Sequence, residues 1–172
     1  MNNLLIVVDM QNDFITGALA NPEGQKIVGK VADYIRNFDG DIVYTMDSHS
    51  KDTYLETQEG QKLPVPHCIV GTDGREIVPE VMAALEARNA TRNIKHTFGS
   101  TDLGKVAGMI EYDTIYLVGV CTDICVISHA MLCKAFAPET RIVVLKDMCA
   151  GVTPESHETA LKAMQACQID IE

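Results

Sequence analysis

Short runs rich in apolar and β-branched residues alternate along this chain with longer amphipathic segments. The short runs are typical of buried strands and occupy residues 4–9, 41–47, 92–95, 114–120, 141–147 and 168–172. The longer segments carry apolar residues at three- and four-residue spacing, which predicts helices over 25–38, 77–88, 102–111, 124–136 and 154–167. Thr153-Pro154 is typical of an N-cap followed by proline at the first helical position.

This alternation restricts the fold class. Strands that are apolar on both faces and separated by helices predict a mainly parallel sheet covered on both sides. With 172 residues, 47% of them hydrophobic, the chain is long enough for one domain with a substantial core and too short for two. We therefore predict a single three-layer α/β/α domain over residues 1–172, built on a Rossmann-like six-stranded sheet.

Composition excludes several functional classes. The formal net charge of −10 argues against phosphate-backbone binding, because nucleic-acid binders need clustered Lys and Arg. No apolar run approaches the roughly 20 residues that span a bilayer, and the opening MNNLLIVVDMQND lacks the features of a secretion signal. We therefore expect a cytoplasmic protein that binds neither nucleic acid nor membrane, with six cysteines that are reduced, metal-bound or catalytic.

The predicted strands end in residues with charged or reactive side chains. These are Asp9, Asp47 with His49 just beyond it, Lys95, Cys121 with Cys125, and Asp147. A single carboxylate at a strand end often only caps the next turn, and a single lysine is commonly solvated. In parallel sheets, however, ligands bind beyond the carboxyl ends of the strands. An acid, a cation and a thiol at one edge therefore indicate a catalytic site.

Three cysteines fall in one segment, VGVCTDICVISHAMLC, at 118–133. We expect Cys125 in the first turn of a helix, where free N–H groups and the helix dipole lower the pKa of a thiol, and where Lys95 would lower it further. Cys133, two turns further on, is expected to be a small buried apolar residue. His129 lies four residues after Cys125 on the same helix face, so a Cys–His dyad remains a competing hypothesis.

Five segments resemble the isochorismatase-like cysteine hydrolases, and within them the nicotinamidases (pyrazinamidases). They are VVDMQNDF (7–14), DSH (47–49), PHCIVGTDG (66–74), KHTFGSTDL (95–103) and VGVCTDICV (118–126). The resemblance covers nearly the whole chain. It implies a catalytic triad of Asp9, Lys95 and Cys125.

The resemblance also implies how the substrate is held. A cis peptide between Val120 and Cys121 would direct the N–H groups of Cys121 and Cys125 to one point, as an oxyanion hole. Phe14, Val120 and Cys121 are expected to line the substrate pocket.

A metal site is implied as well, with Asp47, His49 and His67 as ligands. One carboxylate and two imidazoles suit a divalent transition metal such as Zn²⁺, Fe²⁺ or Mn²⁺. Glu56 or Glu59 could supply a fourth ligand, and the spacing does not decide between them. No organic cofactor is expected.

Two segments depart from the family pattern. The aromatic residue usual before the second histidine is absent from the run Leu63-Pro64-Val65-Pro66-His67, and Phe98 lies only three residues after Lys95. Arg92 is a rival cation for Lys95, but it lies earlier in the strand, and a permanently charged guanidinium suits proton exchange poorly.

The implied activity is the hydrolysis of nicotinamide to nicotinate and ammonia through a cysteine thioester, a step of NAD salvage, in a homo-oligomer that acts on a small-molecule amide. A related hydrolase of another small amide or ureide is the alternative within this class.

A non-catalytic thiol or metal sensor is suggested by six cysteines and five histidines, but the chain has no Cys-x-x-Cys. A nucleotide-binding module is disfavoured because DMQNDF follows the first strand in place of a glycine-rich loop.

Overall fold

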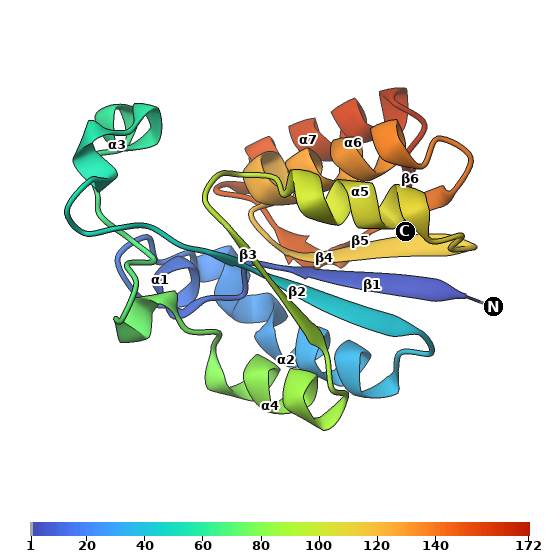
Figure 1. The fold of residues 1–172 in the computed structure, drawn as a ribbon, viewed down its shortest axis with the longest axis horizontal. Coiled ribbons are helices and arrows are strands. Elements are labelled where there is room, and N and C mark those ends of the chain that lie inside the picture. Colours follow the sequence, from blue (N-terminus) through green and yellow to red (C-terminus); the bar gives the residue numbers. More distant parts are fainter. Residues whose placement is uncertain (1) are drawn as a thin grey trace.

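The computed structural model describes residues 2–172, and its centre is a six-stranded parallel sheet (Figure 1). The strands are β1 (Asn3–Val8), β2 (Asp41–Asp47), β3 (Thr91–Lys95), β4 (Thr114–Val120), β5 (Arg141–Ala150) and β6 (Asp170–Ile171). They lie in the order β3-β2-β1-β4-β5-β6, and each neighbouring pair is parallel. The predicted α/β fold with a six-stranded sheet is confirmed.

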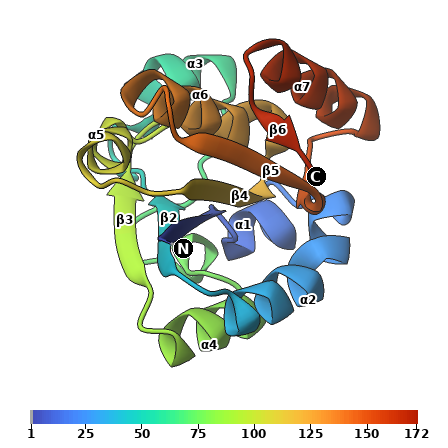
Figure 2. The same cartoon turned by 90° about the vertical axis from the view of Figure 1, so that its right-hand side faces the viewer.

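Helices cover both faces of the sheet (Figure 2). On one face lie α2 (Pro22–Asn37) and α4 (Pro79–Ala87), and on the other lie α5 (Thr101–Met109), α6 (Ile127–Phe136) and α7 (Pro154–Ala166). The sequence pattern missed two short helices, α1 (Asn12–Ile15) and α3 (Gln58–Lys62), which lie at the carboxyl-end edge of the sheet.

The central strand β1 is buried on both faces. Leu5 and Val7 belong to the core shared with α2 and α4, whereas Leu4, Ile6 and Val8 belong to the core under α5, α6 and α7. All five side chains are 0% exposed. The alternation of side chains along a strand divides them between the two cores. The strand therefore delivers the next residue, Asp9, to the middle of the sheet edge.

Capping residues explain where two helices begin. Helix α2 starts at Pro22, three residues before the predicted start, because the Asn21 side chain accepts hydrogen bonds from the N–H groups of Glu23 and Gly24. The predicted Thr153 cap of α7 is confirmed, since its hydroxyl accepts a hydrogen bond from the Ser156 N–H.

The prediction that the fifth strand ends at Asp147 and brings this residue to the site is wrong. Strand β5 continues to Ala150, where Cys149 and Ala150 pair with Gly119 and Val120 after a register shift. Asp147 is exposed within the strand. The polar pair Lys146-Asp147 interrupts the apolar run in the sequence, but the strand resumes its burial beyond it.

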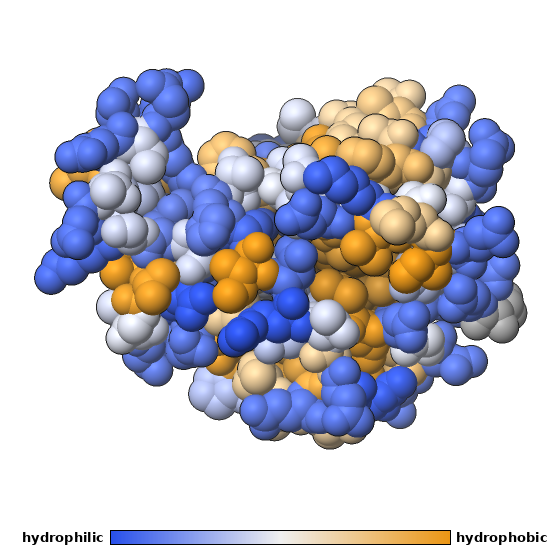
Figure 3. Space-filling model, in the orientation of Figure 1, coloured by the Kyte–Doolittle hydropathy of each residue, from blue (hydrophilic) through white to orange (hydrophobic). Residues whose placement is uncertain are grey.

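The surface differs between the two ends of this view (Figure 3). Polar residues dominate around α3, whereas apolar side chains appear over α5, where Val106, Met109 and Ile110 are 41%, 82% and 41% exposed. Among residues 2–172, none of the helices combines the length and apolar character needed to cross a membrane. Exposed apolar patches often mark interaction sites, and the expected homo-oligomer stays a prediction.

Two buried thiols, Cys133 and Cys149, should make the free energy of unfolding depend on pH in the alkaline range. Burial raises the pKa of Cys133 and that of Cys149 to about 12 each, whereas a thiol in the unfolded chain titrates near its ordinary value of about 8.5. The unfolded state therefore loses protons first, and the free energy of unfolding should fall as pH rises from about 9 toward 12, by several kcal/mol in total.

Urea unfolding followed by circular dichroism between pH 8 and 10.5, under reducing conditions, measures this loss. The double variant Cys133→Ala, Cys149→Ala should show a flatter decline with pH than the parent. Parallel curves for the two proteins would contradict the assignment of the decline to these thiols.

Candidate active site

Asp9 follows β1 directly and is fully buried. Its backbone has φ 48°, in the left-handed region, and its side chain is 0% exposed. The Thr45 hydroxyl donates a hydrogen bond to Asp9 Oδ1 at 2.6 Å and accepts one from the Asp9 N–H at 3.1 Å. Thr45 therefore fixes both the backbone and the carboxylate of Asp9.

Lys95 ends β3 and forms a buried ion pair with Asp9. Its Nζ lies 2.7 Å from Asp9 Oδ2 and 3.7 Å from Cys125 Sγ, and it donates a hydrogen bond to the Thr97 carbonyl at 3.0 Å. Burial lowers the pKa of Lys95, but the negative charges around it, that of Asp9 above all, outweigh burial and raise the pKa above its usual value. The ammonium therefore stays charged beside the thiol. The structure thus brings the acid, the cation and the thiol close together, as the sequence predicted.

Cys125 lies in a π-helical turn, Thr122–Val126, that precedes α6. The Cys121 carbonyl accepts hydrogen bonds from the N–H groups of Ile124 and Val126, so the regular helix begins later than the predicted residue 124. The side chain of Cys125 is buried within the turn. It is in this way held against the ends of β1 and β3.

The expected lowering of the Cys125 pKa is wrong. Burial raises the pKa of this thiol well above its usual value, the Asp9 carboxylate raises it further, and Lys95 only partly opposes them. The helix dipole and Lys95 favour the thiolate, but a thiol removed from water strongly favours its neutral form. A base must therefore accept the proton before the sulfur can act, and the Asp9 carboxylate is the acidic group with the largest effect on this thiol.

The Cys–His dyad is not formed. His129 Nδ1 lies 2.8 Å from the Cys125 carbonyl oxygen, and His129 Nε2 accepts a hydrogen bond from the Ser100 N–H at 3.2 Å. Both ring nitrogens therefore bind backbone groups, and the ring supports the turn instead of the sulfur. Cys133 is 1% exposed within the core, as predicted.

The Val120–Cys121 peptide is cis, as the family resemblance implied. Cys121 is half-buried, and its Sγ lies 4.0 Å from Asn21 Nδ2. Burial raises the pKa of the Cys121 thiol to about 12. The role of the Cys121 and Cys125 N–H groups as an oxyanion hole stays a prediction.

A second cluster lies beside the first and contains the three expected metal ligands. Asp47 Oδ2 lies 2.8 Å from His49 Nε2 and 3.6 Å from His67 Nε2. Glu59 Oε1 lies 3.4 Å from His67 Nε2, and the ligand atoms of all four residues lie within 4.8 Å of one another. The structure thus favours Glu59 over the exposed Glu56 as the fourth member.

Charge dominates this second cluster. Burial raises the pKa of Asp47, but the hydrogen bond with His49 and the nearby His67 ring outweigh it and hold the pKa well below its usual range. Burial lowers the pKa of His67, yet the nearby carboxylates of Asp47 and Glu59 raise the pKa to about 10. The carboxylates of Asp47 and Glu59 thus favour a positive charge in this buried cluster.

The donor set fits a divalent transition metal. Two carboxylates and two imidazoles are ligands that Zn²⁺, Fe²⁺ and Mn²⁺ accept. His67 Nδ1 lies 2.9 Å from the Val65 carbonyl oxygen, so a donated N–H there leaves Nε2 free to face the cluster. Tyr54 packs edge-on against both histidine rings, at 5.0 and 5.3 Å between centroids. These contacts fix the orientation of the two histidine rings.

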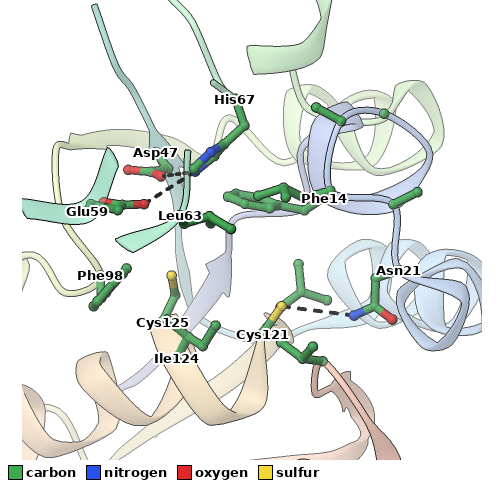
Figure 4. Close-up of a pocket in the computed structure, with 16 residues that line it drawn as sticks. Phe14, Asn21, Asp47, Glu59, Leu63, His67, Phe98, Cys121, Ile124 and Cys125 are labelled. Carbon is green, nitrogen blue, oxygen red and sulfur yellow. Dashed lines mark hydrogen bonds and ion pairs between the residues drawn. The ribbon is translucent and has the colours of Figure 1, made fainter. Parts of the chain in front are cut away.

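One cavity of about 600 Å³ joins both clusters (Figure 4). Phe14, Val120 and Cys121 line it as expected, together with Cys125, and the Phe14 ring lies 5.4 Å from that of His67. The prediction missed several other lining residues: Gly17, Ala18, Leu19, Ala20, Asn21, Leu63, Phe98, Ile124 and Val152. Most lie in loops, where no periodicity marks an inward-facing side chain.

Comparison with known families matches the isochorismatase domain to residues 3–171. The nicotinamidase of Saccharomyces cerevisiae is 28% identical over 215 residues, covering 97% of this chain and 97% of that protein. The nicotinamidase/pyrazinamidase of Mycobacterium tuberculosis is 29% identical, covering 97% of this chain and 96% of that protein. The crystal structure of Pyrococcus horikoshii pyrazinamidase in complex with zinc has a TM-score of 0.82 at 32% identity, covering 100% of this chain and 99% of that one.

The four-residue cluster predicts metal content. The purified protein should carry about one transition-metal ion per chain, and His49→Ala should lose most of it. Glu59→Gln should weaken binding at least about tenfold in a chelator competition, because an amide oxygen replaces a carboxylate ligand.

Glu56→Gln is the matched control, since Glu56 lies three residues away on the same segment and is exposed. Its metal content and affinity should equal those of the parent. Equal metal content in the parent and His49→Ala would remove the site, and equal affinity in Glu59→Gln would return the set to three ligands.

Proposed function

This chain belongs to the isochorismatase family, and from that premise we propose that it is a nicotinamidase, which hydrolyses nicotinamide to nicotinate and ammonia. The observation that carries the proposal is that Cys125, which lies beside Lys95, lines the same cavity as Asp47, Glu59 and His67 of the candidate metal site. Lys95 Nζ reaches Asp9, Cys125 and, at 3.6 Å, Asp47 Oδ1, so the two clusters share one ammonium. The similarity to nicotinamidases along nearly the whole chain supports the same substrate.

The first half of the reaction forms a thioester. Asp9 accepts the proton of Cys125, and the sulfur forms a bond to the amide carbon while the carbonyl electrons move to oxygen. The N–H groups of Cys121 and Cys125 bind this oxyanion, and such donors contribute roughly 3 kcal/mol each. The carbon–nitrogen bond then breaks as Asp9 returns the proton, so that ammonia leaves.

The second half releases the acid. Asp9 accepts a proton from water, whose oxygen attacks the thioester carbon. The carbon–sulfur bond then breaks, and Asp9 returns the proton to the sulfur, which restores the cysteine and releases the acid. Lys95 holds its positive charge throughout and stabilises whichever partner is anionic, the carboxylate or the thiolate. Because Lys95 lies close to both groups, it can stabilise the negative charge on Asp9 before the proton transfer and on Cys125 after it.

The metal would be held by Asp47, His49, Glu59 and His67. When bound, it supplies a Lewis-acidic position for the pyridine nitrogen of the substrate. Phe14 lies beside His67 and offers an apolar face to the ring. This cluster favours nicotinamide over another small amide or a ureide, because a pyridine nitrogen is itself a metal ligand.

The proposal predicts ammonia release from nicotinamide by the metal-loaded protein. Cys125→Ala should abolish it, because the thioester can no longer form. Cys121→Ala should keep substantial activity, because alanine retains the backbone N–H. Enzyme-coupled detection of ammonia measures both variants; an active Cys125→Ala protein, or no turnover by the parent, would reject the proposal.

Thr45 is expected to act as a positioning residue through Asp9. Thr45→Val keeps the shape but removes both hydrogen bonds to Asp9, so kcat should fall by about 10- to 100-fold with little change in KM. Thr45→Ser keeps the hydroxyl and should retain most of the activity.

Thr114→Val is the matched control. Thr114 is also a buried strand threonine, but it begins β4 and therefore lies at the edge of the sheet away from the site. Its kcat should equal that of the parent. Similar losses in Thr45→Val and Thr45→Ser, with native circular dichroism, would show that packing and not the hydroxyl matters at this position.

A further inference from the structure

The cavity is larger than one nicotinamide ring requires. At about 600 Å³ it falls within the range of about 300–1,000 Å³ found for pockets that hold drug-sized ligands. Nicotinamide has a single six-membered ring and one carboxamide. Space therefore remains in the cavity beside the substrate of the proposed function.

The reactive groups gather at one end of this space. Figure 4 shows Glu59, Phe98 and Cys125 on one side and Asn21 on the other, with Cys121 between them. The far end is formed by Asn21, by the residues that precede it in the loop 17–21, and by Val152, whose neighbour Gly151 accepts a hydrogen bond from Asn21. A ring that contacts both Cys125 and the metal cluster lies at the near end and leaves the far end free.

The far end offers apolar surface. Gly17, Ala18, Leu19, Ala20 and Val152 carry no polar side-chain atoms. A substituent placed among them gains contact without a hydrogen bond, provided that it is itself apolar.

Asn21 is the polar residue at this end, and its side chain is already engaged. Its Oδ1 accepts hydrogen bonds from the Glu23 and Gly24 N–H groups, and its Nδ2 donates to the Gly151 carbonyl at 2.9 Å. Among the described residues that line the cavity there is also no Lys or Arg to bind a phosphate or carboxylate group. The far end therefore disfavours charged substituents.

Ring geometry decides which substituent reaches this space. In nicotinamide the carboxamide is on carbon 3 and the nitrogen is atom 1, so both occupy one edge of the ring. Carbon 5 lies on the opposite edge, whereas carbon 6 is next to the nitrogen. With the carboxamide at Cys125 and the nitrogen at the cluster of Asp47, Glu59 and His67, carbon 5 faces away from both.

We propose that the substrate class of this enzyme extends to pyridine-3-carboxamides that carry a bulky apolar group on carbon 5. The inference rests on the proposed function, since it uses the same cysteine and the same orientation of the ring. Water and the 5-substituted amide give the 5-substituted nicotinate and ammonia, and the same carbon–nitrogen bond breaks. The loop 17–21 and Val152 determine this specificity.

Two isomers test the proposal on the metal-loaded protein. The kcat/KM for 5-phenylnicotinamide should lie within about tenfold of that for nicotinamide, whereas 6-phenylnicotinamide should be at least about 100-fold poorer, because its phenyl group collides with the metal cluster. The isomers have the same atoms, so the comparison isolates the position. Equal losses for the two isomers, with nicotinamide hydrolysed normally, would overturn this inference alone.

A second measurement does not depend on turnover. Calorimetry with metal-loaded Cys125→Ala should show tighter binding of the 5-phenyl than of the 6-phenyl isomer. If nicotinamide is not hydrolysed at all, the proposed function fails, and the inference fails with it. Equal binding of the isomers would reject the inference whatever the activity.

A variant locates the specificity. Ala20→Trp places a large side chain at the far end, so the ratio of kcat/KM for 5-phenylnicotinamide to that for nicotinamide should fall at least about tenfold. Ala166→Trp, on the exposed side of α7, is the control and should leave the ratio unchanged. An unchanged ratio in Ala20→Trp would show that the phenyl group does not enter the far end.

Discussion

The buried ion pair between Lys95 and Asp9 is the interaction on which the rest of the site depends. Removing both charges from water costs several kcal/mol per ion, and the pair repays this only if its remaining polar atoms are satisfied. Thr45 binds the free oxygen of Asp9, and the Thr97 carbonyl binds Lys95. The sheet supplies Thr45, because β2 lies between the strands that carry Asp9 and Lys95, and the loop after β3 supplies the Thr97 carbonyl.

The same ammonium connects the thiol with the metal cluster. Asp9, Asp47 and Glu59 bring three carboxylates into one region, and Lys95 is the cation that contacts the first two. The negative charge left over lies nearest to His49 and His67, and there the pKa of His67 rises to about 10. A divalent cation among these four ligands would balance the charge that a proton otherwise balances.

The sequence predicted well those features that depend on chain periodicity and strand ends. Asp9, Asp47, Lys95 and Cys121 each lie at or just beyond the end of a parallel strand, and parallel strand ends meet at one edge. The family resemblance then distinguished Cys125 from its neighbours. The degree of burial of Cys125 could not be predicted in this way. The raised pKa of this thiol depends on atoms from distant segments, which no local sequence pattern shows.

Loops and the short helices within them account for most of what could not be predicted. Glu59 reaches the cluster because Tyr54 is buried and its hydroxyl donates a hydrogen bond to the Leu63 carbonyl at 2.8 Å, which closes the segment between them. Such a closure leaves no periodic signal, so the spacing could not separate Glu59 from Glu56. Asp147 shows the converse, since a polar pair within a strand resembles the end of one.

These two kinds of element divide the work of the site. The acid and the ammonium come from the ends of β1 and β3, and the sulfur comes from the π-helical turn that follows β4. Strand register fixes the distance between the first two, which changes little without disrupting the sheet. Glu59 comes from the short helix α3, and His67 and the far end of the cavity come from loops. These connecting segments lie outside the strands, so their replacement leaves the register intact. Asp47 belongs to both groups, because it ends β2 and contacts Lys95 on one side and His49 on the other. Under the proposed function, changes in these connecting segments should therefore alter which amide is bound while the cysteine chemistry persists.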